Sequence, residues 1–493
     1  MMKKNLLRAL SVVGVLIAVL PGIAVIRAMT NSSVQVAVTP VDIDVDREAV
    51  QRFSQAIRFP TIADPEGDTQ PEPFLEFHEF LEQAFPRVHE SLELEKVNEL
   101  TLHFRWVGTV PGTPHVGTPH VVFVAHQDVV PVEAGTIEAW THPPFSGAIA
   151  EGYVWGRGTI DNKLSVMGLL EAVEGLLAKG VVPERTIHFV FGHDEEVGGT
   201  RGAKVVAEKL AAEGVEVEAV IDEGLVIADG IVPGVDGPVA LIGVAEKGYL
   251  TLRLTARTAG GHSSMPPRNL AVTKLSRALV RLDEHPMPAS LDGPAAMMFD
   301  AVAPEMDFGY RLLFSNRWLF GQLILGQMES GPSTNALVRT TMAPTMLEGS
   351  ERENVLPQAA SVVINFRLHP RDSMDDALAH VRRVIDDAEI EVEAVGEFQS
   401  EASPVARLDT RAFRLMETAV REVYPSVVVS PGMVLAATDS RHFTNLTSDV
   451  YRFMPVTLTS EELERIHGTD ERVGVEEYLD AVRFYKRVLE GIL

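Results

Sequence analysis

The residues of this chain best suited to chemistry are imidazoles and carboxylates that directly follow short apolar segments. They are His126 and Asp128 after one segment, His193, Asp194, Glu195 and Glu196 after a second, and Asp222 and Glu223 after a third. Asp161 stands alone at the expected start of a helix. Gathered in one place, so many negative charges would repel one another unless cations neutralised them. Nitrogen and oxygen ligands in this mixture suit zinc or a similar divalent metal ion.

The segments that precede these residues read as strands of a parallel sheet. Residues 120–125, 186–191 and 217–221 are short, continuous apolar runs, which are typical of strands buried on both faces. Between them, residues 162–179 and 201–213 carry apolar side chains at helical spacing. This alternation predicts an α/β fold with a mostly parallel central sheet and helices on both faces. Sites in such sheets form beyond the carboxyl ends of the strands, so we expect the imidazoles and carboxylates at one rim.

Each of these residues has an ordinary structural interpretation when it is taken alone. Asp161 could cap a helix, the acids at 194–196 could form a solvated loop, and His193 could face a carbonyl group. The joint pattern favours a shared site, because chance does not place charged residues at successive strand ends.

The periodicity of the chain changes after Gly243 and indicates a second module. Three strands and two helices are expected there, the strands at 248–258, 361–368 and 390–395 and the helices at 269–284 and 373–387. The alternation in these strands predicts a small α+β module with one open sheet face. The first pattern returns near Ala402. We therefore expect a catalytic domain at 46–244 and 399–493, interrupted by a lid or dimerisation domain at 245–398.

The N-terminal segment reads as an export signal. Residues 9–26 form an uncharged apolar run of 18 residues behind three basic residues, which is at the lower end of what spans a bilayer. Residues 1–27 are expected to be a signal anchor or a cleaved signal peptide, followed by a linker at 28–45. Either alternative places the rest of the chain outside the cytoplasm, anchored to the membrane or secreted.

The composition excludes several classes of protein. The formal net charge is −26, and a surface this acidic repels phosphate backbones, so no nucleic-acid partner is expected. Without cysteine, the chain has neither a thiolate metal site nor a cysteine nucleophile. The sequence also lacks the G-x-S-x-G elbow of serine hydrolases and the Walker loop of nucleotide-binding proteins.

Six short motifs occur in order along most of the chain: HQDVVP at 126–131, WGRGTIDNK at 155–163, GHDEEVGG at 192–199, VIDEG at 220–224, GGHSSMPP at 260–267 and RIHGTDER at 465–472. In these motifs the chain resembles the di-zinc aminoacylase, carboxypeptidase S and glutamate carboxypeptidase family of metallopeptidases. It looks most similar to carboxypeptidase S and to the secreted N-fatty-acyl amino acid hydrolases/synthases. The resemblance implies a zinc-peptidase-like catalytic domain with a ferredoxin-like inserted lid.

The resemblance also implies a role for the residues of the predicted rim. Two zinc ions per chain are expected, with other divalent metals as alternatives. The implied ligands are His126 and Asp222 for the first ion, Glu196 and His467 for the second, and Asp161 as the bridge between them. Asp128 would orient the His126 ring, and Glu195 would be the general base. Glu223 is a rival for the place of Asp222, because some relatives carry Glu there.

The resemblance places further residues around the substrate. His262, on the lid, would close over the substrate carbonyl oxygen, in some relatives from the partner subunit, so a homodimer through the lid is an expectation. Arg367 could bind a free α-carboxylate on the substrate, with Asn335 as a polar partner. Arg441 is a third candidate, but it could equally pair with an acid of the protein.

The apolar stretch at 287–328 is long for a connection within a lid. Such a stretch most often packs as core helices or makes a dimer contact. A sharper hypothesis makes it the wall of a binding site for a long acyl chain.

These observations predict a di-zinc hydrolase that releases a C-terminal amino acid from a peptide or an N-acyl amino acid. The motifs do not separate carboxypeptidase action from N-fatty-acyl amino acid synthesis and hydrolysis. A non-catalytic, membrane-tethered peptide-binding protein is a further alternative. Its mark would be a missing ligand or base, and the sequence lacks none of them.

Overall fold

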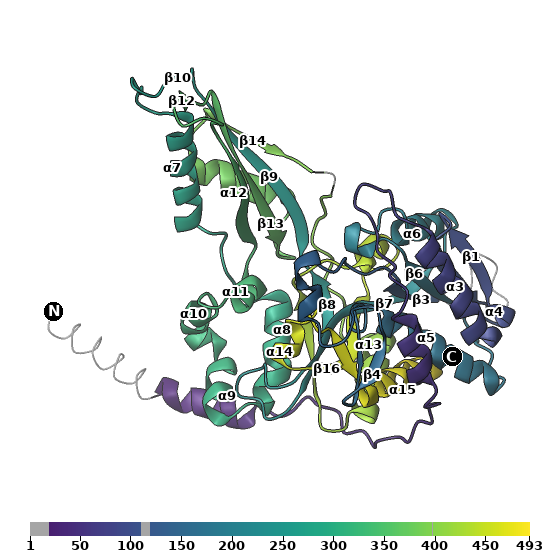
Figure 1. Ribbon diagram of the computed structural model, residues 1–493. Helices are drawn as coiled ribbons and strands as arrows, with labels where there is room; N and C mark the ends of the chain where they lie inside the picture. The colour runs from purple at the N-terminus through teal and green to yellow at the C-terminus, as the bar shows by residue number, and fades with distance from the viewer. Residues whose placement is uncertain (1–18, 110–118, 397) are drawn as a thin grey trace.

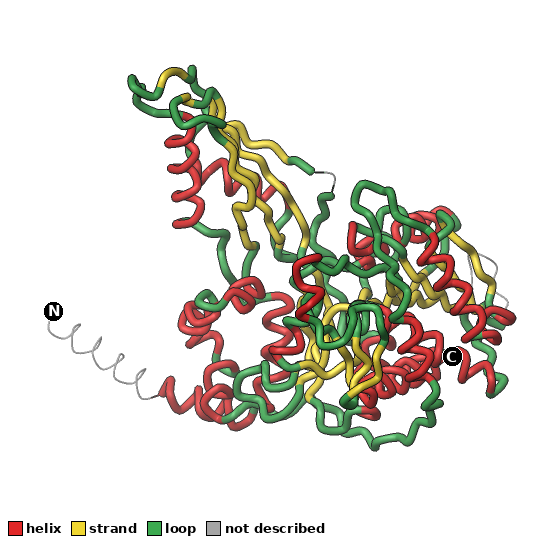
Figure 2. Tube along the Cα trace, in the orientation of Figure 1, coloured by secondary structure: helices red, strands yellow, loops and turns green. Residues whose placement is uncertain are grey.

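The computed structural model of the protein describes residues 19–109, 119–396 and 398–493 (Figure 1). A wide sheet forms the body of the molecule, and a narrow antiparallel sheet projects from it (Figures 1 and 2). This arrangement confirms the predicted α/β fold with an inserted lid.

The central sheet has eight strands, and parallel pairs join β6 to β3, β3 to β7, β7 to β16 and β8 to β15. In spatial order the strands are β1 (Glu93–Val97), β2 (Thr101–Trp106), β6 (Ile187–Gly192), β3 (His120–His126), β7 (Val217–Ala228), β16 (Val450–Leu458), β8 (Val239–Glu246) and β15 (Val428–Val434). The three expected apolar runs form β3, β6 and β7, which lie side by side and end at the same rim.

Helices cover both faces of this sheet. They are α2 (Ala49–Ala56), α3 (Glu72–Ala84), α4 (Pro86–Ser91), α5 (Lys163–Ala178), α6 (Ala203–Ala212), α13 (Arg411–Val423), α14 (Ser460–Leu463) and α15 (Val475–Ile492). Successive side chains of β3 point to opposite faces of the sheet. Phe123 packs in the core that contains α5 and α15, whereas Val122 and Val124 pack in the core that contains α6. Burial on both faces explains why β3 is continuously apolar.

The projecting lid has a four-stranded antiparallel sheet in the order β11-β13-β9-β14. Its elements are β9 (Gly248–Arg257), α7 (Ala271–Glu284), β11 (Thr341–Glu348), β13 (Ala359–Leu368), α12 (Met374–Ile385) and β14 (Ile390–Ala394). This βαββαβ succession is that of a ferredoxin-like module. Burial alternates along β13, because one face of the sheet packs under the two helices and the other stays partly exposed.

Four helices between α7 and β11 do not belong to the lid sheet. They are α8 (Gly293–Val302), α9 (Phe308–Phe314), α10 (Arg317–Met328) and α11 (Pro332–Val338). Their core includes Val302 and Ile324 and closes on Val239 of β8 and Val428 of β15, at the edge of the central sheet. The apolar stretch at 287–328 is therefore only partly core: α8 is largely buried, whereas α9 has no buried residue and α10 has two. The domain limits 245–398 stay a prediction.

The residues before α2 run along that same edge. A helix spans residues 19–30, and the linker that follows contacts the edge strand β15. The side chain of Gln35 donates to the Val429 carbonyl oxygen (3.0 Å) and accepts from the Val429 amide (2.8 Å), so it covers backbone groups that an open edge would expose. Among the described residues, no helix has the length and hydropathy to cross a membrane. Residues 1–18 of the expected anchor lie outside the described residues.

Candidate metal centre

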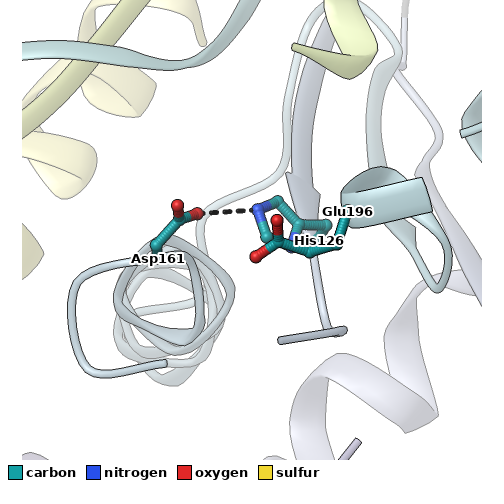
Figure 3. Close-up of side chains that lie close together, drawn as sticks. All are labelled: His126, Asp161 and Glu196. Atoms are coloured by element: carbon teal, nitrogen blue, oxygen red, sulfur yellow. Dashed lines mark hydrogen bonds and ion pairs between the residues drawn. The ribbon is translucent and has the colours of Figure 1, made fainter. Parts of the chain in front are cut away.

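Three of the predicted ligands meet beyond the carboxyl ends of β3 and β6 (Figure 3). His126 is the last residue of β3, Glu196 lies in the short 3-10 helix η2 (Glu195–Val197) that follows β6, and Asp161 precedes α5. Ligand atoms of these three residues all lie within 4.8 Å of one another. The rim expected from the order of strands and acids is therefore formed.

Asp161 lies between two histidines, with one carboxylate oxygen toward each. His126 Nε2 is 3.0 Å from Asp161 Oδ1, and His467 Nε2 is 3.1 Å from Asp161 Oδ2. Glu196 Oε2 lies 3.3 Å from the same nitrogen of His467. Asp161 thus contacts both histidines. Among the described residues, the groups whose ligand atoms lie close enough to hold a cation are His126 with Asp161 and Glu196, and His126 with Glu195 and Glu223. The bridging role of Asp161 stays a prediction.

The remaining carboxylate beside His126 belongs to Glu223 and not to Asp222. Glu223 Oε1 is 3.2 Å from His126 Nε2. The Asp222 carboxylate instead accepts backbone hydrogen bonds from Glu223 and Ser440, both of 2.8 Å. The assignment of the first-ion carboxylate to Asp222, with Glu223 as its rival, stays a prediction. A bulge in β7, where the pairing with β16 skips from Asp222 to Leu225, turns Glu223 toward His126.

The donor set fits a divalent cation. Burial lowers the pKa of His126, but Glu223, Asp128 and Asp161 outweigh it and hold that pKa well above its usual range. Hydrogen bonds to Asp161 and Glu196 raise the pKa of His467 to about 10. Among the described residues, the buried Glu196 Oε1 has no hydrogen-bond partner. The carboxylates that raise these two pKa values are negative charges that a bound cation would neutralise.

Asp128 connects the His126 ring to the turn that carries Glu195 and Glu196. Its carboxylate accepts the backbone N–H groups of Glu195 (3.2 Å) and Glu196 (3.0 Å). One of its oxygens also lies 3.4 Å from His126 Nδ1, and that nitrogen is 2.9 Å from the Asp128 carbonyl oxygen. Asp128 thus fixes both the ring and the turn, which matches the orienting role that the resemblance implies.

Glu195 is buried beside the ligands. Its ligand atom lies within 4.8 Å of those of His126 and Glu223, so geometry alone would also allow it to hold a cation. Burial raises its pKa well above the usual range, and the nearby carboxylates of Asp439 and Glu223 add to this effect. A carboxylate with a raised pKa can accept a proton near neutral pH, which is what a general base must do.

A buried ion pair holds the loop of His467 against the loop of Asp161. Arg157 Nη1 lies 2.5 Å from Glu471 Oε2, and Arg157 also donates to the backbone carbonyl oxygen of His467 (3.0 Å). Glu471 in turn accepts the amide of Ile160 at 2.8 Å. Sequence reasoning overlooked both Arg157 and Glu471, although each lies within a motif that carries a ligand.

His193 and Asp194 point away from the ligands. His193 Nδ1 is 2.6 Å from the Thr101 hydroxyl, and the Asp194 carboxylate accepts the Arg201 amide at 2.8 Å. Both residues therefore have structural partners, but not the expected ones: Asp194 is buried rather than solvated, and His193 faces a hydroxyl rather than a carbonyl group. Asp439 was also overlooked: it is buried in the 3-10 helix η4 (Asp439–Phe443), and among the described residues neither of its carboxylate oxygens has a hydrogen-bond partner.

The candidate substrate residues occupy three places. Arg367 lies on β13 at the base of the lid, with its guanidinium 4.6 Å from the centre of the Tyr249 ring. Asn335 is half-buried on α11. Arg441 is buried and donates to the carbonyl oxygens of Thr438 and Gly198, both at 2.8 Å, so its guanidinium is largely engaged within the protein.

His262 does not lie at the metal centre. It is exposed in the pair of β10 (Gly261–His262) with β12 (Val355–Leu356), which lies at the tip of the lid (Figure 1). The short strand pair extends the lid away from the central sheet, so the expected contact between His262 and a substrate carbonyl is absent from this arrangement.

Comparison with known proteins adds family evidence. The family model described as peptidase family M20/M25/M40 matches residues 122–491. The chain is 39% identical to a probable carboxypeptidase S-like protein of Dictyostelium discoideum, over 90% of this chain and 85% of that protein. It is 37% identical to an N-fatty-acyl-amino acid synthase/hydrolase of Xenopus tropicalis, over 90% of this chain and 86% of that protein.

Solved structures share the fold at low sequence identity. An M20 family metallo-carboxypeptidase of Sulfolobus solfataricus has a TM-score of 0.66 at 18% identity, covering 92% of this chain and all of that one. Human carnosine dipeptidase 1 has a TM-score of 0.60 at 15% identity, covering 90% of this chain and 96% of that one. At these identities the likeness concerns the fold alone.

Proposed function

Because this chain belongs to peptidase family M20/M25/M40, a family of metallohydrolases, we propose that it is a di-zinc enzyme that cleaves an amide bond and releases a C-terminal amino acid. The observation that carries the proposal is the position of Asp161 between His126 and His467, with Glu195 beside them. His126 and Glu223 would hold one ion, His467 and Glu196 the other, and Asp161 both.

Amide hydrolysis needs a nucleophile, a proton carrier and a donor for the charge that develops on the carbonyl oxygen. Two divalent cations, when bound, would lower the pKa of a water toward neutrality and polarise the carbonyl group. Glu195 takes the proton of the attacking water and passes it to the amide nitrogen as the C–N bond breaks. The second transfer is required because, without that proton, the nitrogen would have to leave as an anion, which is a poor leaving group.

The amino acid released would be recognised by its carboxylate. Arg367 and Asn335 lie near the junction of lid and catalytic domain, and a guanidinium can bind a carboxylate through two parallel hydrogen bonds. His262 would reach the carbonyl oxygen after closure of the lid, or from the lid of a second copy in a homodimer. Its exposure at the lid tip supports a part played after such a movement.

Two substrate classes use the same centre. The relatives named above include a probable carboxypeptidase S-like protein and an N-fatty-acyl-amino acid synthase/hydrolase, so peptides and N-acyl amino acids are both candidates. A peptide-binding protein without catalysis is disfavoured, because the candidate ligands and the base are all present. For localisation, we propose that residues 1–27 anchor the chain or direct its secretion.

Release of amino acid by the purified full chain tests the function. The assay uses a panel of N-acyl amino acids and dipeptides, with zinc and with a chelator, beside Glu195→Gln. Chelator-sensitive release that is lost in Glu195→Gln supports the proposal, and the ranking of substrates chooses between the two classes. Absence of both turnover and bound metal would refute it.

A further inference from the structure

We propose that the outer face of α10, together with the helix at residues 19–30, is a surface that rests on a lipid bilayer. The inference goes beyond catalysis and rests on the proposed N-terminal anchor. It starts from the helix at residues 19–30, which lies beside α9 at one end of the molecule and is hydrogen-bonded to the junction of α9 and α10 (Figure 1).

The helix at residues 19–30 is attached to the helical layer at α9 and α10. Ala24 and Ala28, one turn apart, are buried, and the Asn316 side chain donates to the Ala24 carbonyl oxygen at 2.9 Å. Asn31 donates to the Ser315 hydroxyl at 2.8 Å. The residues of the opposite side of this helix are apolar and uncovered, and Ile26 is 62% exposed.

The outer face of α10 is uncharged and carries uncovered apolar side chains beside Gln322 and Gln327. Ile324 and Met328 face the core of the helical layer. Trp318, Leu319 and Leu323 are 52%, 39% and 63% exposed. A soluble helix normally carries charged residues opposite its buried face, but α10 after Arg317 carries no charged residue at all.

The distribution of charge points to a lipid surface. About one residue in seven of the chain is Asp or Glu, yet residues 308–328 contain neither. A hollow of about 420 Å³ beside the helix at residues 19–30 is lined by Arg27, Trp318 and Arg317, which is paired with Asp300 at 2.6 Å. Arginine and tryptophan beside an apolar face are the side chains that favour the headgroup level of a bilayer.

Continuity with the apolar run distinguishes a bilayer from a second copy of the chain. Residues 9–26 form one uncharged run, and its last residues lie in the helix that is hydrogen-bonded to Asn316, just before α10. A run held in a membrane would therefore bring Trp318, Leu319 and Leu323 to the same membrane. If the exposed residues Trp318, Leu319 and Leu323 were a dimer contact, the apolar run would have no reason to end beside them.

Tryptophan fluorescence can test the contact in the full chain. Of the four tryptophans, Trp106, Trp140 and Trp155 are buried, so a quencher in the lipid reaches chiefly Trp318. The chain is reconstituted in phosphatidylcholine vesicles with and without bromine on the acyl chains. We expect brominated lipid to reduce emission of the chain and to leave emission of Trp318→Phe nearly unchanged.

Substitution of the patch supplies the matched comparison. Leu319→Glu/Leu323→Glu should abolish the quenching while flotation with vesicles through the N-terminal run persists. Leu75→Glu changes an exposed leucine of α3, away from α10. Brominated lipid should reduce the emission of this variant as much as that of the unchanged chain. Melting temperature and hydrolysis of a soluble dipeptide, measured on each variant, separate a failed fold or a failed enzyme from a failed surface.

Three results would overturn the proposal. A chain that floats with vesicles while Trp318 is quenched only by aqueous iodide has the anchor without the surface. Shielding of Trp318 from both quenchers together with a doubled mass would identify a second copy as the occupant. A chain that does not bind vesicles lacks both the anchor and the surface.

Discussion

The guanidinium of Arg441 lies 3.8 Å from the carboxylate of Glu195, measured from Nη1 to Oε1. Arg441 is also packed 4.7 Å from the centre of the Phe398 ring, and Phe398 contacts Tyr249 of the lid strand β9. Arg441, which was predicted to bind substrate, therefore lies between Glu195, the proposed general base, and the lower end of the lid. Its charge favours the ionised form of Glu195 and opposes the effect of burial.

Arg441→Gln should move the acidic limb of the kcat/KM profile to higher pH. Removal of a nearby positive charge raises the pKa of a carboxyl group, so Glu195 would lose its proton only at higher pH. Activity near neutral pH should fall about tenfold, which is within the range of one general-base contribution. A pH profile measured on a dipeptide checks this. A changed KM with an unmoved profile would instead favour the substrate-binding role.

Glu223→Gln and Asp222→Asn should have different effects, although the residues are adjacent. Glu223→Gln removes a proposed ligand and should lower metal affinity at least about tenfold. Asp222→Asn should retain both ions but lower the melting temperature, because Asp222 accepts backbone N–H groups of Glu223 and Ser440. Metal content after dialysis and thermal unfolding measure the two effects. Loss of metal in Asp222→Asn alone would restore the original assignment.

Arg157→Met should affect the metal centre without touching a ligand. Breaking a buried ion pair costs about 3–5 kcal/mol, since Glu471 would keep an uncompensated charge. The same change frees the His467 carbonyl oxygen, so metal affinity should fall together with stability. Addition of Glu471→Met should recover part of the stability. Unchanged metal affinity in Arg157→Met would show that the pair serves the fold alone.

The burial of Lys247 should make the free energy of unfolding depend on pH, independently of the candidate metal centre. It is buried between β8 and β9 and donates to the carbonyl oxygens of Ala336 and Arg339. Burial, reinforced by Arg367, lowers its pKa from 10.5 to about 7. Between these values the unfolded chain binds the proton that the folded chain lacks, so folding stability rises with pH.

Lys247→Met should remove this rise. Relative to the variant, the unchanged chain should gain up to about 1.4 kcal/mol per pH unit above neutrality. Thermal unfolding between pH 7 and pH 10 measures the difference. Parallel stability curves for the two proteins would show that Lys247 stays protonated through its carbonyl partners.

Sequence reasoning located the rim at which most of the candidate ligands meet, because parallel strands end at one rim. His126, Glu195 and Glu196 follow runs whose burial makes them unambiguous, and that placement needs no knowledge of side-chain direction. The choice between Asp222 and Glu223 does need it. A bulge in β7 decides which of the two points inward, and the backbone pairing that creates the bulge is not visible in the chain itself.

Other features depend on long-range packing. The stretch at 287–328 is recognisably apolar, but the surface it covers, the edge formed by β8 and β15, is set by the tertiary fold. Asp439 looks like an ordinary loop residue in sequence and is distinctive only because it is buried. The place of His262 at the lid tip follows from the length of the lid strands.

The candidate ligands also come from distant parts of the chain, so a bound ion would act as a cross-link. More than two thirds of the sequence lies between His126 and His467, and both contact Asp161. Ions held at these residues would close the longest loops of a protein that has no cysteine and hence no disulfide. Chelation should therefore loosen the attachment of the C-terminal segment to the first half of the chain, and proteolysis near residue 467 would reveal it.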